Sequence, residues 1–558
     1  MKHNGFQRKW WKEQVVYQIY PRSFKDSNGD GIGDIQGINS ELDYLKDLGV
    51  DIIWLSPHFD SPNADNGYDI RDYRKVMDEF GTMADFDEML AGIKARDMKL
   101  IIDLVVNHSS DEHEWFEQAK SSKDNPYRDY YIWKPGKGDE PPTNYPAFFG
   151  GSAWEKAGPD GEYYLHYFAK KQPDLNWENP KLRAEVYDLM RFWLDKGVDG
   201  FRMDVIPLIS KDQSFPDLDA ETLRHPETFY ASGPRLHEFL HEMNREVMSQ
   251  YDAFSVGECF GVNQARALRL TDERRQELDL AFIFDIARIG RDNWRQTGWT
   301  LQEFKELFTI QATSDQFHWP TIFLANHDNP RAVSTFGNAS AEYREQSAKL
   351  LAMLLLTQKG TPFIYQGEEI GMTNYNFTDF SQFDDVEVRG MLPQVTANGV
   401  PQSEYLYHLN QTGRDHARTP MQWSDAPNAG FTGGEKSWFL VNPNFSDINV
   451  KANQQEPNSV LAFHKQLLSY RKENLDLIYG DYYDIDPDHG SVFAYTRSTE
   501  TCTHLVVLNM SNEAIAFVLP EQFDGYDCTL SNYPNKSKIT QSTANLRPWE
   551  ARLYRLAV

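Results

Sequence analysis

The sequence predicts an α/β fold: a (β/α)8 TIM barrel with an inserted subdomain after strand 3 and a C-terminal antiparallel β domain. Two observations predict the barrel. Eight short runs bounded by turn residues alternate with helical patterns, and most of these runs are almost continuously apolar, as strands buried on both faces of a parallel sheet must be. The expected strands cover 15–19, 51–57, 99–106, 200–205, 254–258, 280–285, 321–328 and 361–366.

The segments between these runs have helical periodicity. Thr82 is followed three positions later by Asp85, which is a capping-box pattern, and apolar residues then recur at i, i+3, i+4 and i+7 from Phe86. The same spacing starts again at Val186. It stops before Gly197, a residue that can end a helix just ahead of the fourth strand.

Two long gaps interrupt the alternation. Residues 107–180 are too many for one crossover helix, and a second insertion, 373–435, follows the eighth strand. After a helix near 460–471, short alternating runs predict antiparallel strands. The expected domains are a catalytic barrel over 1–106 and 181–478, an inserted subdomain over 107–180 that overhangs the barrel, and a C-terminal β-sandwich over 479–558.

Composition limits the classes of partner. The chain has 558 residues, 40% of them hydrophobic and 25% charged, which is ordinary for a globular protein. A net charge of -27 argues against nucleic acid and against an anionic membrane as partners. The sequence contains no apolar run of about 18 residues and starts without an apolar signal core. We therefore expect a monomer in the cytoplasm, or in the periplasm if a signal peptide has been removed.

Carboxylates end three of the expected strands. Asp204, Glu258 and Asp328 each close an apolar run, and a charge is costly to bury there unless the protein uses it. A fourth run contains Asp103 and leads to His108. Because the carboxyl ends of all barrel strands lie at one face, these side chains should line one pocket.

The four segments, in this order, resemble the signature regions of glycoside hydrolase family 13, the α-amylase and α-glucosidase group. The resemblance implies cleavage with retention, which needs a carboxylate nucleophile and a protonated carboxyl about 5–5.5 Å apart. It makes Asp204 the nucleophile, Glu258 the general acid/base and Asp328 the carboxylate that holds sugar hydroxyls. The alternative is a structural ion-pair network at the top of the barrel.

Residues near the trio are expected to support it. Arg202 lies two residues before Asp204, so strand alternation points both into the barrel mouth, where the arginine should keep the nucleophile ionised. By resemblance, His108 and His327 bind sugar hydroxyls, and Asp103 orients them.

A loop after the second strand resembles the family loop that holds the non-reducing glucose. There Asp65 accepts hydrogen bonds from the sugar and Tyr68 stacks on its ring, although an ordinary Asn-Gly turn is the alternative. Arg414 resembles the arginine that closes this subsite and favours exo-acting cleavage; the alternative is a surface ion pair. The resemblance also implies substrate contacts for Phe149, Phe168 and Gln172.

A glycine-rich acidic loop follows the first strand. Its oxygen-bearing side chains are the hard ligands that Ca²⁺ or Mg²⁺ prefers, but it is no EF-hand loop because its twelfth position is Gly37. The resemblance implies a structural Ca²⁺, with Mg²⁺ as the alternative, and no organic cofactor. An acidic turn without an ion is the other possibility. The expected ligands are Asp26, Asn28, Asp30, Asp34 and the backbone carbonyl of Ile32.

Specificity signals conflict. From end to end the chain is similar to oligo-1,6-glucosidases and sucrose isomerases. Val205 matches enzymes that cleave α-1,6 bonds, whereas α-1,4-specific relatives tend to have Ala and isomerases Thr. Phe260 and Phe284 stand where isomerases keep an aromatic clamp for fructose, although core packing would also explain them. Arg288 begins a segment that resembles the isomerases' arginine-rich loop, with Gly290 replacing its first acidic residue.

We therefore expect a retaining, exo-acting α-glucosidase that hydrolyses short α-glucosides, foremost α-1,6-linked isomaltulose and isomaltose, with trehalulose as a further substrate. The first alternative is a sucrose isomerase, and the next is a general oligo-1,6-glucosidase. A third alternative, from another class, is a catalytically inactive subunit of a transporter. Family members of that kind lack parts of the catalytic set, which this sequence retains.

Overall fold

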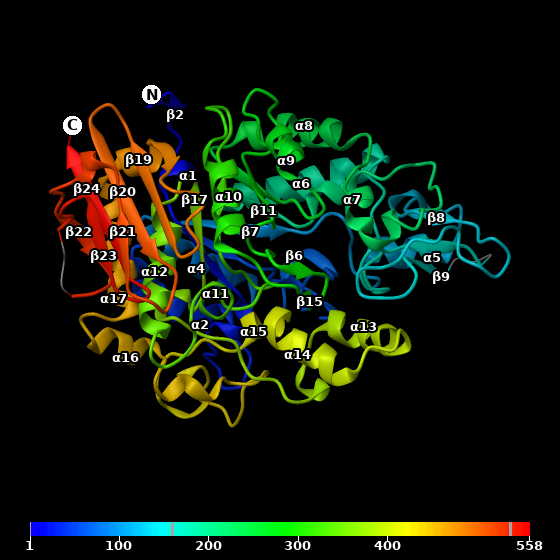
Figure 1. The fold of residues 1–558 in the computed structure, drawn as a ribbon. Coiled ribbons are helices and arrows are strands. Elements are labelled where there is room, and N and C mark those ends of the chain that lie inside the picture. Colours follow the sequence, from blue (N-terminus) through cyan, green and yellow to red (C-terminus); the bar gives the residue numbers. More distant parts are fainter. Residues whose placement is uncertain (1, 158–160, 535–537, 558) are drawn as a thin grey trace.

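The computed structural model describes residues 2–157, 161–534 and 538–557, with a barrel at its centre (Figure 1). All eight expected strands are present. They form one parallel sheet in the order β13-β12-β11-β7-β4-β3-β17-β16. The strands are β3 (Val16–Ile19), β4 (Ile52–Leu55), β7 (Lys99–Leu104), β11 (Gly200–Met203), β12 (Phe254–Glu258), β13 (Leu280–Phe282), β16 (Thr321–Ile322) and β17 (Thr361–Tyr365).

The two end strands, β13 and β16, bring the sheet almost to closure. Within the described residues no backbone ladder joins them; instead the Thr321 hydroxyl donates to the carbonyl of Ala281 over 2.8 Å. Aromatic rings fill the interior: Phe282 lies 5.5 Å from Trp54 and 4.6 Å from Phe363 between ring centroids. The barrel is therefore a packed core, and a site can lie only at its ends.

Both end strands are shorter than the sequence predicted. The runs 280–285 and 321–328 leave the ladder after Phe282 and Ile322, and the residues that follow turn toward the barrel mouth. Apolar composition alone does not show where a segment stops pairing, because most of these loop residues, Ile283 and Phe323 among them, are buried like the strands, although Asp285 is exposed.

Helices surround the barrel. The predicted capping box is present at the start of α4, where Thr82 accepts from the Asp85 amide and its own amide donates to the Asp85 carboxylate. Helix α6 ends at Gly197, whose φ is 109°. The main outer helices are α3 (Leu42–Leu48), α4 (Met83–Ala95), α6 (Pro180–Lys196), α8 (Leu236–Glu246), α9 (Gln264–Leu270), α10 (Leu301–Ala312), α12 (Arg344–Thr357) and α17 (Val460–Glu473).

Two insertions border the mouth of the barrel. The first carries a short helix and a small antiparallel sheet in the order β8-β10-β9, and it lies at the opposite end of the molecule from the C-terminal strands (Figure 1). The second carries helices after β17. Their elements are α5 (Glu114–Ser121), β8 (Trp133–Lys134), β9 (Trp154–Lys156), β10 (Tyr163–Leu165), α13 (Val386–Ala397), α14 (Gln402–Thr412) and α15 (Asp415–Arg418).

The C-terminal region is antiparallel β structure, as predicted. A five-stranded sheet has the order β18-β19-β20-β24-β22, and β21 pairs with β23. Leu505 and Phe517, one from each sheet, belong to one apolar cluster. The strands are β18 (Asp481–Asp484), β19 (Val492–Ser498), β20 (Cys502–Asn509), β21 (Ile515–Val518), β22 (Cys528–Ser531), β23 (Thr543–Leu546) and β24 (Ala551–Ala557).

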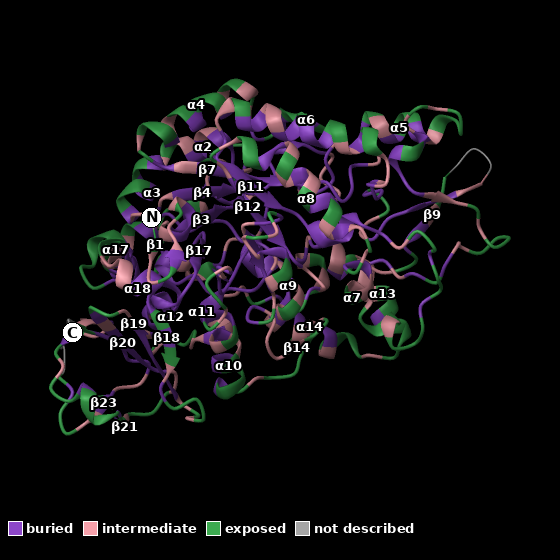
Figure 2. Cartoon of the chain, turned by 90° about the horizontal axis from the view of Figure 1, so that it is seen from above, coloured by how far each residue is buried: buried purple, intermediate pink, exposed green. Residues whose placement is uncertain are grey.

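Burial follows this layering. The barrel strands are buried, whereas α4, α5 and α6 present exposed faces to solvent (Figure 2). Among the described residues, no helix combines the length and apolar character needed to cross a bilayer.

Candidate active site

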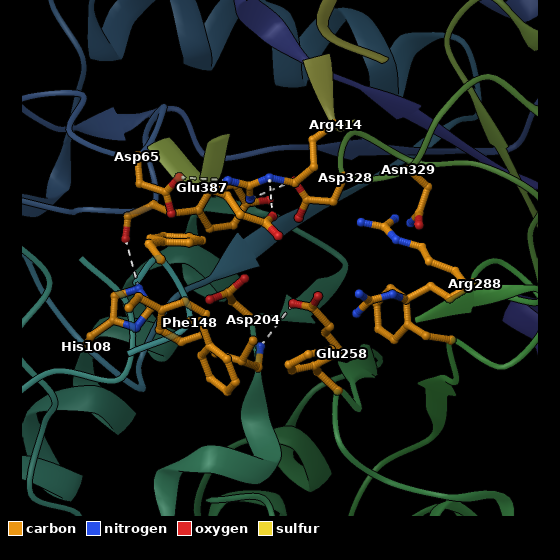
Figure 3. Close-up of a pocket in the computed structure, with 17 residues that line it drawn as sticks. Asp65, His108, Phe148, Asp204, Glu258, Arg288, Asp328, Asn329, Glu387 and Arg414 are labelled. Atoms are coloured by element: carbon orange, nitrogen blue, oxygen red, sulfur yellow. Dashed lines mark hydrogen bonds and ion pairs between the residues drawn. The ribbon is translucent and has the colours of Figure 1, made fainter. Parts of the chain in front are cut away.

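A pocket of about 800 Å³, including space open to solvent, lies where the barrel strands end. Figure 3 shows Asp204 and Glu258 close together, with Asp65, Asp328 and Arg414 at one end of the pocket and Arg288 at another side. The structure therefore brings most of the predicted site residues together. Those that line the pocket are Asp65, Tyr68, His108, Phe149, Phe168, Asp204, Val205, Glu258, Phe260, Phe284, Arg288, Asp328 and Arg414.

Asp204 and Glu258 are neighbours because their strands are neighbours. In the ladder between β11 and β12, Met203 is opposite Gly257, so the next residue of each strand carries a carboxylate to the same place. One guanidinium contacts both: Arg202 donates from Nη1 to Asp204 Oδ1 over 2.8 Å and from Nη2 to Glu258 Oε2 over 2.6 Å. The pair thus forms one buried unit.

Val205 has a strained backbone beside this pair. Its φ is +35° and its ψ is 38°, a left-handed conformation that a β-branched residue rarely adopts and that costs on the order of 1–3 kcal/mol. In this conformation its amide donates to Glu258 Oε2 over 3.2 Å. The strain therefore accompanies a contact that orients the second carboxylate.

The electrostatics differ from the sequence expectation that Arg202 keeps Asp204 ionised. Burial, together with the nearby Glu258 and Asp103 carboxylates, outweighs Arg202 and raises the pKa of Asp204 well above its usual range. Burial also raises the pKa of Asp103 to about 6. Two carboxyl groups this close oppose each other's ionisation, which adds to the effect of burial on Asp204.

Asp103 and Arg202 were expected at the barrel mouth, where they would support the carboxylate trio, but neither lines the pocket. Asp103 is fully buried and accepts from Trp54 Nε1 over 2.7 Å and from Arg202 Nη1 over 2.5 Å. Arg202 is 1% exposed, and its Nη1 and Nη2 donate to the carboxylates of Asp103, Asp204 and Glu258. Both residues lie behind the Asp204–Glu258 pair, so they can position it but do not reach the cavity.

His327 and Gln172 also lie behind the pocket wall. His327 Nδ1 is 2.8 Å from the Gln18 amide nitrogen and its Nε2 is 2.6 Å from the Tyr68 hydroxyl. Burial lowers the pKa of His327 to about 3, so its ring is neutral. Gln172 Nε2 donates to Asp65 Oδ2 over 3.1 Å. Their direct role is to hold Tyr68 and Asp65, which do line the cavity.

Arg414 and Asp328 lie at one end of the pocket, together with Asp65. The side chain of Arg414 is only 12% exposed and lies in a charged cluster, with Nη1 3.3 Å from Asp328 Oδ1, so it is not part of a surface ion pair. Burial works to raise the pKa of Asp328, but His327, Arg414 and Arg418 outweigh it and hold that pKa well below its usual range. Burial raises the pKa of Asp65 to about 7, against the opposing charge of Arg414.

Aromatic side chains form a further wall. The rings of Phe260 and Phe284 are 6.2 Å apart between centroids and nearly perpendicular. Arg288 lies over the Phe260 ring at 5.4 Å. Since both phenylalanines line the pocket as well as pack on each other, core packing alone does not describe them.

Sequence reasoning missed four lining residues: Phe148, Arg291, Asn329 and Glu387. Three of them had a signal in the sequence. Phe148 lies next to Phe149, Arg291 lies in the arginine-containing segment that starts at Arg288, and Asn329 directly follows Asp328. Glu387 had none. It comes from α13 in the second insertion, whose position over the barrel cannot be inferred from local pattern.

The predicted cation loop is held by its own hydrogen bonds. Asp26 Oδ1 accepts from the amides of Asn28 and Gly29, and Asp34 Oδ1 accepts from the amide of Gly37 over 2.6 Å. Within the described residues, no group of three or more His, Cys, Asp or Glu side chains converges as a cation site would need. The side-chain chemistry suits a hard cation but the geometry does not show a ligand set, so the structural Ca²⁺ stays a prediction.

Comparison with known proteins agrees with this geometry. The family model "Alpha amylase, catalytic domain" matches residues 18–480. The chain belongs to the α-amylase family. The sequence resemblance to glycoside hydrolase family 13 is thereby confirmed, and the chain is an enzyme of this family. A second model, "Alpha-amylase SusG C-terminal domain", matches residues 492–552.

Relatives with similar sequence identity to this chain include both oligo-1,6-glucosidases and isomaltulose synthases. An oligo-1,6-glucosidase of Parageobacillus thermoglucosidasius is 50% identical over 99% of both chains. The solved isomaltulose synthase of Protaminobacter rubrum is 50% identical over 98% of this chain and 99% of that one, with a TM-score of 0.97. A variant of the Erwinia rhapontici isomaltulose synthase, solved with its natural substrate sucrose, is 50% identical over 98% and 99%, with a TM-score of 0.96. Identity alone does not separate hydrolase from isomerase.

Proposed function

We propose that this protein is a retaining, exo-acting α-glucosidase that hydrolyses short α-glucosides, foremost isomaltulose and isomaltose, with trehalulose as a further substrate. The observation that carries the proposal is the buried Asp204–Glu258 pair bridged by Arg202, at the base of a pocket of disaccharide size.

The pair can perform both steps of retention. Asp204 attacks the anomeric carbon while Glu258 gives its proton to the departing glycosidic oxygen, which leaves a covalent glucosyl ester on Asp204. Glu258, now ionised, takes a proton from water, and the resulting hydroxyl displaces Asp204. Retention requires Glu258 to carry this proton and Asp204 to be ionised when the substrate arrives.

The charged end supports exo action on a terminal glucose. Asp65, Asp328 and Arg414 lie together there, and the carboxylates can accept from sugar hydroxyls. Tyr68 stacks on His327 with ring centroids 5.3 Å apart, which fixes its ring as a platform for a sugar. These contacts would hold one glucose unit and leave the Phe260 side for the leaving group.

Sucrose isomerase is the second candidate. The wall of Phe260, Phe284 and Arg288 favours it, because an aromatic clamp could retain fructose long enough for it to attack the glucosyl ester. Val205 favours hydrolysis, because it resembles the residue of enzymes that cleave α-1,6 bonds.

Product chromatography separates the two. Incubation with isomaltulose should yield glucose and fructose, and incubation with isomaltose should yield glucose alone. Conversion of sucrose mainly to isomaltulose or trehalulose would instead establish the isomerase. Truncating Phe260 or Phe284 to Ala should reduce kcat/KM on isomaltulose more than on isomaltose, by about 10–200-fold. Phe192→Ala, in α6 away from the pocket, is the control; equal losses on both sugars would leave the pocket phenylalanines with a packing role only.

A further inference from the structure

The two insertions touch through their backbones beside the pocket. Gly390, in α13, faces the carbonyl oxygen of Phe149, and a Cβ at position 390 would lie 1.9 Å from that oxygen. From the other side, Gly150 faces the carbonyl oxygen of Gly390, where a Cβ would lie 2.8 Å away. Both separations are below any that real Cβ atoms show, so only glycine on each side permits this contact.

This contact adjoins pocket-lining side chains on both sides. Phe149 lines the pocket, and its ring lies 5.1 Å from the guanidinium of Arg414. Glu387 also lines the pocket, and it precedes Gly390 by three residues, so the two share one face of α13. Its carboxylate is 3.4 Å from Arg414 Nε. Arg414 is therefore in contact with Phe149 from the first insertion and with Glu387 from the second. Figure 3 shows Glu387 beside Arg414.

The start of α13 is anchored independently. Asp385 caps the helix by accepting from the Glu387 amide over 2.9 Å, and it also accepts from Arg414 Nε over 2.9 Å. With this end fixed, the separation of Gly390 from Phe149 decides how closely the rest of the helix approaches the first insertion. That separation in turn fixes where the Phe149 ring meets Arg414.

We propose that Gly390 and the Phe149–Gly150 segment form a clasp that closes the glucose end of the pocket and sets how tightly a terminal glucose is held. Gly390 is a positioning residue: it lines no part of the cavity and acts through Phe149 and Arg414. The inference rests on the proposed function only in placing glucose at this end, and it is independent of the sugar linked to that glucose.

The primary test replaces Gly390 with Ala. The added methyl must push the insertions apart by more than an ångström, which misplaces the Phe149 ring. We expect the Kd for D-glucose, measured by calorimetry, and the KM for 4-nitrophenyl α-glucoside to rise about tenfold or more, with kcat changed less than about threefold. Gly433→Ala is the matched control, since neither glycine has a positive φ and a Cβ at 433 meets no atom within 4 Å.

A second pair of variants approaches from the other insertion. Gly150→Ala should weaken glucose binding, whereas Gly151→Ala should not, although both positions have positive φ, +92° and +81°. A Cβ at 151 meets no atom within 4 Å, so this control matches the backbone strain without the contact. The Gly390→Ala and Gly150→Ala effects should be less than additive, because both open the same clasp.

The outcomes separate the two proposals. Unchanged glucose affinity in Gly390→Ala, or equal losses in Gly150→Ala and Gly151→Ala, overturns the clasp. Absence of hydrolysis of every α-glucoside overturns the proposed function, while the difference in glucose affinity still decides the clasp. Thermal unfolding of all four variants excludes loss of fold as the cause of a change in affinity.

Discussion

Replacing Arg202 with lysine tests whether one guanidinium organises the catalytic pair. Arginine donates here to Asp103, Asp204 and Glu258 at 2.5–2.8 Å. Lysine keeps the charge but has no planar fork, so its ammonium can replace either Nη1 or Nη2 but not both. In the first case the bond to Glu258 is lost, and in the second the bonds to Asp103 and Asp204 are lost. Each charge-assisted hydrogen bond contributes about 1.5–3 kcal/mol, so the loss is about 1.5–6 kcal/mol.

If that loss falls on the transition state, kcat/KM drops by about 10–10⁴-fold, since about 1.4 kcal/mol corresponds to a factor of ten. The assay is release of nitrophenol from 4-nitrophenyl α-glucoside, with urea unfolding measured in parallel. Arg71→Lys is the control, because Arg71 makes a similar bidentate pair with Asp60 but its side chain is 40% exposed. An Arg202→Lys enzyme with a third of wild-type activity would refute the reasoning.

Three further predictions follow from the same geometry. Asp204→Asn should lower kcat by at least about 10³-fold with little change in Tm. Glu258→Gln should lose more activity on isomaltose than on 4-nitrophenyl α-glucoside, whose leaving group needs no proton. Equal losses on the two substrates would show that Glu258 is not the general acid. Burial raises the pKa of Asp65 to about 7, so KM should fall as pH rises through 7 and the carboxylate forms. The same raised pKa makes a contribution to the free energy of unfolding that is full at low pH and lost as pH rises through 7. Asp65→Asn should remove both effects. If the inflection in KM persists in this variant, it belongs to another group. Chelation with EDTA should lower Tm through loop 26–34 without changing turnover in the cold, because that loop does not line the pocket; immediate inactivation would contradict this.

The barrel was predictable because its strands are buried on both faces, so their sequences are almost continuously apolar. The placing of Asp204, Glu258 and Asp328 in one pocket was predictable for a related reason, since all three are charges that end such runs. Their common position required only the rule that all strands of a barrel end at one face.

The predictions that the structure did not confirm concern features that depend on tertiary structure. Strand alternation correctly directs Arg202 and Asp103 to the inside of the barrel. The sequence cannot show that both are buried beneath the residues that line the pocket. The raised pKa of Asp204 arises from burial beside other carboxylates, which no local pattern encodes. Glu387 reaches the pocket through the packing of an insertion, and the Phe149 and Gly390 contact is likewise set by tertiary structure.

The unpaired seam of the barrel has a consequence for aggregation. Strands β13 and β16 have edges that no ladder within the described residues covers, and an exposed edge is a template for pairing with another molecule. Here each edge is only two or three residues long, both strands are fully buried, and the Thr321 hydroxyl already occupies the Ala281 carbonyl. The enzyme can therefore leave its circumference incompletely hydrogen-bonded without offering neighbouring molecules a strand to extend.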